Sequence, residues 1–112
     1  MRDPLERLQD ILEAIQQIQR YTATGRKVFE EEELVQSWCV RHLQIIGEAA
    51  RALPVETRNS IPEIPWSNII GMRHILVHNY FGIDTELVWN GVEIQLDFLK
   101  TAIESFLKQQ WE

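Results

Sequence analysis

Apolar side chains recur at steps of three and four residues along most of this chain, which is the spacing that places them on one face of an α-helix. The first such segment begins with Asp3 as N-cap and Pro4 at the first helical position. It continues to about Thr22, where Thr22-Ala23-Thr24-Gly25 breaks the pattern. Its apolar stripe consists of Leu5, Leu8, Ile11, Leu12, Ile15 and Ile18.

A second helix is predicted to follow the run Glu30–Glu33, because acidic side chains are favourable in the first turn of a helix. It extends to Leu53 and is stopped by Pro54. Its predicted apolar face contains Leu34, Trp38, His42, Ile45, Ile46, Ala49 and Leu53. Residues 54–64 indicate an irregular connection with one short turn at Val55–Arg58.

Two more helices complete the pattern. One starts near Pro65-Trp66 and ends around Asn79–Gly82, where Asn and Gly can adopt the left-handed geometry that closes a helix. Asp84 then caps a last long helix with the stripe Leu87, Val88, Val92, Leu96, Leu99, Ile103, Phe106 and Leu107. We therefore predict a single all-α domain over residues 1–112, an up-down bundle of four main helices with room for one extra short helix.

Composition narrows the function classes. No apolar run approaches the roughly 20 residues that span a bilayer, and no basic-then-apolar signal segment opens the chain. The single cysteine, Cys39, excludes an internal disulfide and suits a reducing compartment. A cytoplasmic protein without a membrane partner is expected.

The net charge of −6 argues against unselective binding to duplex nucleic acid, which needs a broad basic face. The charge is unevenly distributed, however. Residues 34–80 carry four arginines against three glutamates and all three histidines, whereas both flanking segments are acidic. The sequence therefore leaves room for a small, local anion site in the middle of the chain.

Within that middle segment, a guanidinium, two imidazoles and a phenol are concentrated in Arg73-His74-Ile75-Leu76-Val77-His78-Asn79-Tyr80. A guanidinium binds phosphate, and an imidazole transfers protons near neutral pH. On an ideal helix, Arg73 and His78 point about 140° apart. They converge if His78 lies at the frayed helix end or if a second copy of the chain supplies one of them. The alternative is an exposed arginine and a histidine that merely caps the helix.

A zinc site is a further alternative. Cys39-x2-His42 and His74-x3-His78 have spacings that two helices can use to supply a thiolate and three imidazoles. Against zinc, Cys39 has the sequence context of a small core residue, and His42 falls on the predicted apolar face.

Tyr80, followed by Phe81, fits aromatic packing at the end of a helix. Its hydroxyl is only two residues from His78, however, which places it within reach of the same site.

The pattern Arg73-x4-His78-x-Tyr80 resembles the signature of HepT toxins, a branch of the HEPN (higher eukaryotes and prokaryotes nucleotide-binding) superfamily. The resemblance covers essentially the whole chain. The other segments that carry it are Arg2-Asp3, Tyr21-Thr22 with Gly25-Arg26, Gln44–Ala49, Ile64-Pro65-Trp66, Ile69–Arg73 and Tyr80–Asp84.

This resemblance implies a HEPN fold, a homodimer, and metal-independent endoribonuclease activity on tRNA or mRNA at a cleft between two subunits, without a cofactor. It also implies a toxin–antitoxin module whose MntA-like nucleotidyltransferase antitoxin transfers AMP to Tyr80. In the mechanism that we expect, His78 transfers protons, Arg73 holds the scissile phosphate and His74 orients or assists. The products would be a 2′,3′-cyclic phosphate and a 5′-hydroxyl.

Two functions of other classes remain open. The first is a non-catalytic HEPN-like module that binds a nucleotide or a protein, with Arg73 and His78 as an anion site. The second is a helical dimerisation domain in which Tyr80 and the tryptophans form the interface. Toxicity that is lost in Arg73→Ala or His78→Ala would favour the enzyme over both.

Overall fold

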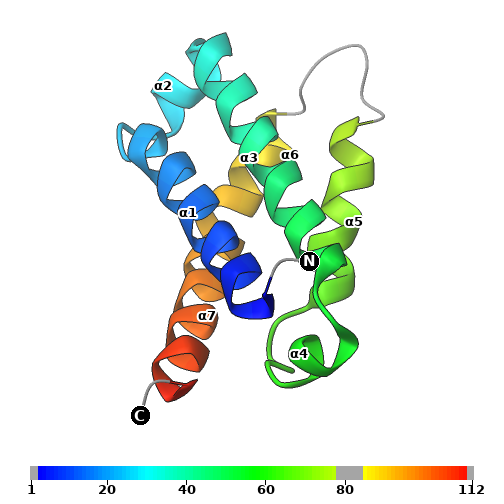
Figure 1. Ribbon diagram of the computed structural model, residues 1–112. Helices are drawn as coiled ribbons and strands as arrows, with labels where there is room; N and C mark the ends of the chain where they lie inside the picture. The colour runs from blue at the N-terminus through cyan, green and yellow to red at the C-terminus, as the bar shows by residue number, and fades with distance from the viewer. Residues whose placement is uncertain (1–2, 78–84, 111–112) are drawn as a thin grey trace.

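The computed structural model describes residues 3–77 and 85–110, and within these ranges every regular element is helical (Figure 1). The elements are α1 (Pro4–Thr22), α2 (Arg26–Glu31), α3 (Glu33–Ala52), α4 (Val55–Asn59), α5 (Trp66–Val77), α6 (Thr85–Asn90), a π-helical segment (Gly91–Gln95) and α7 (Leu96–Gln110). The all-α prediction is therefore confirmed. The predicted helix end at Asn79–Gly82 and the predicted cap at Asp84 lie outside the described residues.

Helix α1 begins and ends where the sequence predicts. The Asp3 side chain accepts a hydrogen bond from the backbone N–H of Leu5 at 2.8 Å, which satisfies one of the unpaired donors at the helix start. The buried residues of α1 are Leu8, Ile11, Ala14, Ile15, Ile18 and Thr22. One face of this amphipathic helix thus enters the core, as its periodicity predicts.

Helix α2 was not predicted. The acidic run contains a break at Glu32, whose φ of −107° and ψ of 102° are extended, so α2 ends before it and α3 starts at Glu33. The side-chain amide of Gln36 donates to the backbone oxygens of Phe29 and Glu30 at 2.9 and 3.0 Å, which pairs two carbonyls at the end of α2. Phe29 is wholly buried and holds this short helix against the core.

The predicted apolar face of α3 is partly wrong. Leu34 is 84% exposed and Ile45 is 37% exposed, while Trp38 and His42 are half-buried. The residues of α3 that are buried are Gln36, Cys39, Leu43, Ile46, Gly47, Ala49 and Ala50. Helix α3 thus carries two sets of residues with helical spacing, the predicted face and the set that is buried. Packing against the neighbouring helices determines that the latter set enters the core.

The connection between α3 and α5 contains the short turn that the sequence predicts, formed as α4. The indole N–H of Trp66 donates to the backbone oxygens of Arg58 and Ile61 at 2.9 and 3.1 Å. Ile61 and Ile64 are buried beneath this connection. The bonds from Trp66 therefore tie the loop to the first turn of α5.

The predicted last helix is formed by α6, the π-helical segment and α7 in succession. Trp89 is buried, and its indole N–H donates to Glu93 Oε2 at 2.9 Å across the start of the π-helical segment.

Among the described helices, no stretch combines the length and the hydropathy needed to span a lipid bilayer.

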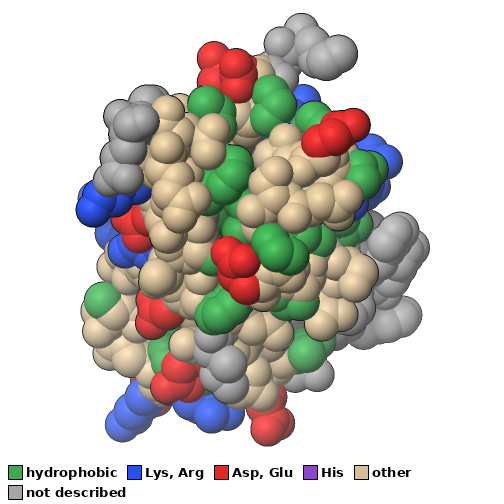
Figure 2. Space-filling model, turned by 90° about the horizontal axis from the view of Figure 1, so that it is seen from below, with side chains coloured by type: hydrophobic (Ala, Val, Ile, Leu, Met, Phe, Trp, Pro, Cys, Tyr) green, Lys and Arg blue, Asp and Glu red, His purple; other side chains and the backbone are tan. Residues whose placement is uncertain are grey.

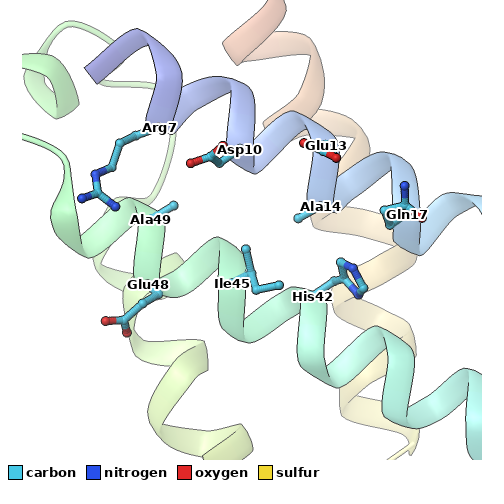
Figure 3. A pocket seen from close by; sticks show the side chains of 9 residues that line it. All are labelled: Arg7, Asp10, Glu13, Ala14, Gln17, His42, Ile45, Glu48 and Ala49. Atoms are coloured by element: carbon cyan, nitrogen blue, oxygen red, sulfur yellow. The ribbon is translucent and has the colours of Figure 1, made fainter. Parts of the chain in front are cut away.

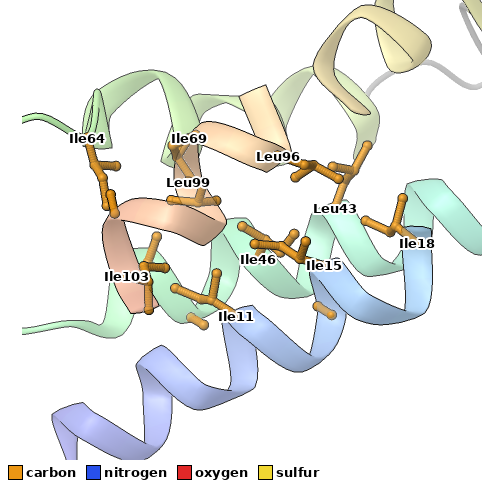
Figure 4. Packing of buried hydrophobic residues seen from close by; sticks show 14 of the residues in the cluster. Ile11, Ile15, Ile18, Leu43, Ile46, Ile64, Ile69, Leu96, Leu99 and Ile103 are labelled. Atoms are coloured by element: carbon orange, nitrogen blue, oxygen red, sulfur yellow. The ribbon is translucent and has the colours of Figure 1, made fainter. Parts of the chain in front are cut away.

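Helix α3 lies between α1 and α5, and α7 packs against α1 (Figure 1). Aliphatic side chains of these four helices meet in one core (Figure 4). Representative members are Ile11 and Ile15 of α1, Leu43 and Ile46 of α3, Ile69 of α5 and Leu99 and Ile103 of α7. This packing fixes α5, and with it Arg73, against α3.

Candidate functional site

Arg73 leaves α5 on the side that faces α3. Its Nε lies 2.8 Å from Oε2 of Glu48, and its side chain is 30% exposed. A charge-assisted bond of this length restricts a long, flexible side chain to one region. The predicted phosphate-binding guanidinium is thus held at the junction of two helices.

Gly47 allows this junction to be close. A Cβ atom on residue 47 would lie 3.0 Å from the Cβ of Arg73 and 3.3 Å from the backbone oxygen of Ile69. Both distances are shorter than ordinary van der Waals contacts between such atoms. The absence of a side chain at position 47 therefore lets α5 approach α3 at the residue that carries the guanidinium.

Glu48 also contacts a second arginine. Its Oε1 lies 3.5 Å from Nη2 of Arg51, one helical turn further along α3. The side chains of Glu48 and Arg51 are 53% and 60% exposed. One carboxylate thus stands between two guanidinium groups, with Arg73 the less exposed of the two.

A groove of about 350 Å³ runs between α1 and α3 beside this cluster (Figure 3). Glu48 lines one end and His42 the other. The remaining lining residues are Arg7, Asp10, Glu13, Ala14, Gln17, Ile45 and Ala49. Three of the lining side chains are carboxylates, so the groove is a poor site for a phosphate.

His42 is oriented by the backbone of its own helix. Its Nδ1 lies 2.8 Å from the backbone oxygen of Trp38, and because a carbonyl oxygen only accepts, Nδ1 donates the proton. The rings of His42 and Trp38 are 4.4 Å apart between centroids, and Tyr21 packs edge-on against Trp38 at 5.4 Å. The structure therefore gives His42 an intrahelical partner at the edge of the core.

The zinc alternative gains no support from Cys39. The thiol is wholly buried, and burial raises its pKa to about 11, which disfavours the thiolate that a metal requires. Cys39 is thus the small core residue that the sequence context indicates. In the part of the chain that the structure describes, no group of three or more His, Cys, Asp or Glu side chains could hold a metal ion.

The other predicted site residues are beyond what the structure tests. His74 belongs to α5, but its side chain is not among those described. His78 and Tyr80 lie outside the described residues. Gly47 and Glu48, which contact Arg73, and Arg51, which contacts Glu48, were not predicted as site residues. The signal that could have indicated the first two is their place in Gln44–Ala49, one of the segments that carry the family resemblance.

The surface seen in Figure 2 carries no continuous basic area on its described part. Lys and Arg side chains lie mainly near the margins of this face, and Asp and Glu side chains are scattered between apolar ones (Figure 2). The described part of this face therefore lacks the broad basic area that unselective binding to duplex nucleic acid needs.

The all-α architecture of the described residues is that of the HEPN class, which the sequence resembles. The chain matches the family model described as ribonuclease HepT-like over residues 11–106, and it belongs to that family.

Similar proteins have names of the same kind. A Thermococcus cleftensis protein named "Probable ribonuclease HepT" is 37% identical over 90% of this chain and 93% of its own length. Two proteins named "putative RNase" come from Methanocaldococcus jannaschii and Caldanaerobacter subterraneus. They are 35% and 31% identical over 92% and 98% of this chain, and over 95% and 99% of their own lengths. No solved structure matches the chain.

Proposed function

We propose that this protein is the toxin of a toxin–antitoxin module and acts as a metal-independent endoribonuclease on cytoplasmic tRNA or mRNA. The observation that carries the proposal is the match to a ribonuclease family over residues 11–106, a range that includes Arg73, His74, His78 and Tyr80. The fixed position of Arg73 beside Glu48 supports it, because a phosphate-binding cation must be oriented before the substrate arrives.

The proposed reaction is an internal transesterification. The ribose 2′-oxygen attacks the phosphorus while a base removes its proton, and the bond from phosphorus to the 5′-oxygen breaks as an acid protonates that oxygen. His78 carries the proton transfers, Arg73 neutralises charge on the phosphate and His74 orients or assists. One chain supplies one His78, so base and acid come from the two subunits of a homodimer whose cleft joins both copies.

The test uses purified protein and total RNA in the presence of a chelator. We expect cleavage that leaves 2′,3′-cyclic phosphate and 5′-hydroxyl ends, and a loss of roughly 100-fold or more in Arg73→Ala and in His78→Ala. His42→Ala is the matched control, since His42 lies in the groove on α3 and should leave cleavage intact. Fragments with 3′-hydroxyl ends would contradict the mechanism. Binding of RNA without any cleavage would favour the non-catalytic module.

Tyr80 is the proposed site of control by an MntA-like nucleotidyltransferase antitoxin. AMP on its hydroxyl would place bulk and negative charge two residues from His78, and both effects oppose RNA binding. We expect Tyr80→Phe to remain toxic when the cognate antitoxin is co-expressed, and Tyr21→Phe to be silenced like the wild-type protein. If the antitoxin silences Tyr80→Phe equally well, control operates by masking of the toxin instead.

A further inference from the structure

We propose that Arg51 is a second RNA-binding residue, which contacts a phosphate next to the scissile one, and that Glu48 is the positioning residue for Arg51 and Arg73 together. This inference rests on the proposed function, because it assumes that Arg73 binds the scissile phosphate. The two arginines differ in exposure, since the Arg73 side chain is 30% exposed and the Arg51 side chain is 60% exposed.

The two carboxylate oxygens of Glu48 serve different arginines. Oε2 lies 2.8 Å from Arg73 Nε, and Oε1 lies 3.5 Å from Arg51 Nη2. The contact to Arg73 uses Nε, the nitrogen bonded to its aliphatic chain, so Glu48 orients the guanidinium from the side of that chain. The three residues together carry one net positive charge, within a protein whose net charge is −6.

The contact between Glu48 and Arg51 adds little to fold stability. Exposed ion pairs contribute little to stability, because water and salt screen them and two long side chains must be ordered. Glu48 and Arg51 are more than half exposed, so their contact belongs to that class. Two guanidinium groups that contact the same carboxylate are, however, suited to a polyanion whose phosphates repeat along a strand.

The charge around the cluster adds to the argument. The groove between α1 and α3 is lined by one cation, Arg7, and by three carboxylates, those of Asp10, Glu13 and Glu48, so its excess of negative charge opposes a phosphate backbone. Arg51 stands at the C-terminal turn of α3, away from the acidic start of that helix at Glu33. A strand bound at Arg73 therefore meets attractive charge in the direction of Arg51 and repulsive charge along the groove.

Salt dependence of binding tests the role of Arg51. The probe is a short single-stranded RNA with a 2′-O-methyl group on every ribose, which cannot be cleaved through its 2′-oxygen. Each lost phosphate contact should reduce the slope of log Kd against log salt concentration by about 0.7. We expect this reduction in Arg51→Ala and an unchanged slope in Arg41→Ala, which removes an exposed arginine elsewhere on the same helix. Equal slopes in both variants would overturn the assignment of Arg51.

Kinetics separate binding from positioning. Arg51→Ala should raise KM about tenfold with little change in kcat, because a contact made equally in the ground and transition states affects KM alone. Glu48→Ala should lower kcat, and Glu48→Gln should restore most of it, since the amide oxygen can still accept from Arg73. A kcat that rises in Glu48→Ala would show that the carboxylate competes with phosphate, which would overturn its positioning role.

The inference and the proposed function fail in different ways. If the wild-type protein cleaves no RNA, the proposed function fails, and the salt slope with the methylated RNA still decides whether Arg51 binds phosphate. If the wild-type protein cleaves RNA while Arg51→Ala matches it in both KM and salt slope, the inference fails alone. Thermal unfolding of each variant serves as the control for folding, and we expect little change in Tm.

Discussion

Gly47 of α3 lies directly against the Cβ of Arg73 of α5, at a point where a Cβ on residue 47 would make contacts tighter than ordinary van der Waals distances. The nearest approaches of an added Cβ would be 3.0 Å to Arg73 Cβ and 3.3 Å to the backbone oxygen of Ile69. The position of the guanidinium relative to Glu48 therefore depends on the absence of a side chain at residue 47. A substitution at Gly47 should therefore shift the groups of the candidate site without removing any of its charged side chains.

Gly47→Ala should reduce both stability and ribonuclease activity. Alanine favours the helix by up to about 1 kcal/mol, but overpacking at a tight helix contact costs about 1–3 kcal/mol. We expect a net loss of roughly 1 kcal/mol in urea unfolding and a lower kcat, because α5 must move away from Glu48.

Gly71→Ala is the matched control for that substitution. Gly71 lies in α5, and no described atom is within 4 Å of the position that its Cβ would take. The variant should gain about 0.4–1 kcal/mol of stability by restricting the unfolded chain. A loss of activity in Gly71→Ala as large as that in Gly47→Ala would contradict the role assigned to the close contact.

Trp66→Phe should destabilise the connection between α4 and α5. The substitution removes the single indole N–H that the carbonyl oxygens of Arg58 and Ile61 share, and the loss of such a bond costs about 1 kcal/mol. We expect the free energy of unfolding to fall by roughly 1 kcal/mol in urea. Leu34→Ala, at a side chain that is 84% exposed, should change it by less than about 0.5 kcal/mol.

Cys39 should make the protein sensitive to alkaline pH. Burial raises the pKa of its thiol from 9.0 to about 11, so the folded state retains a proton that the unfolded state releases. This contribution to stability is fully present below pH 9 and is lost as the pH rises through 11, on the order of 2 kcal/mol in all. Urea unfolding at a series of pH values should show a steeper decline above pH 9 in the wild-type protein than in Cys39→Ala. Parallel declines would show that the thiol does not contribute.

Phe29→Ala should reveal whether α2 is anchored by its single buried side chain. Removing a wholly buried phenyl ring typically costs about 3–5 kcal/mol. Val28→Ala, one residue earlier and 37% exposed, should cost far less. Hydrogen exchange of the α2 amides should increase in Phe29→Ala, while a pattern equal to that of Val28→Ala would mean that α2 is held by other contacts.

Much of the fold can be predicted from local patterns. The start of α1 at Pro4 follows from Asp3 as a cap, and the end of α3 follows from Pro54. Helix α2 was missed because Glu30–Glu33 resembles a helix start, whereas Gln36 pairs with carbonyl oxygens on the far side of the break. That pairing depends on how the chain turns at Glu32, which the composition of the run does not reveal.

The sequence by itself determined the helical class, the approximate limits of the long helices and the family, because periodicity, caps and motifs are properties of neighbouring residues. The tertiary structure alone decided which stripe of α3 is buried, leaving Leu34 exposed and Cys39 enclosed. It also decided that Glu48 meets Arg73, since contact between two helices depends on how closely their backbones approach. At this point Gly47 sets that approach, and its effect appears only when α5 is packed against it.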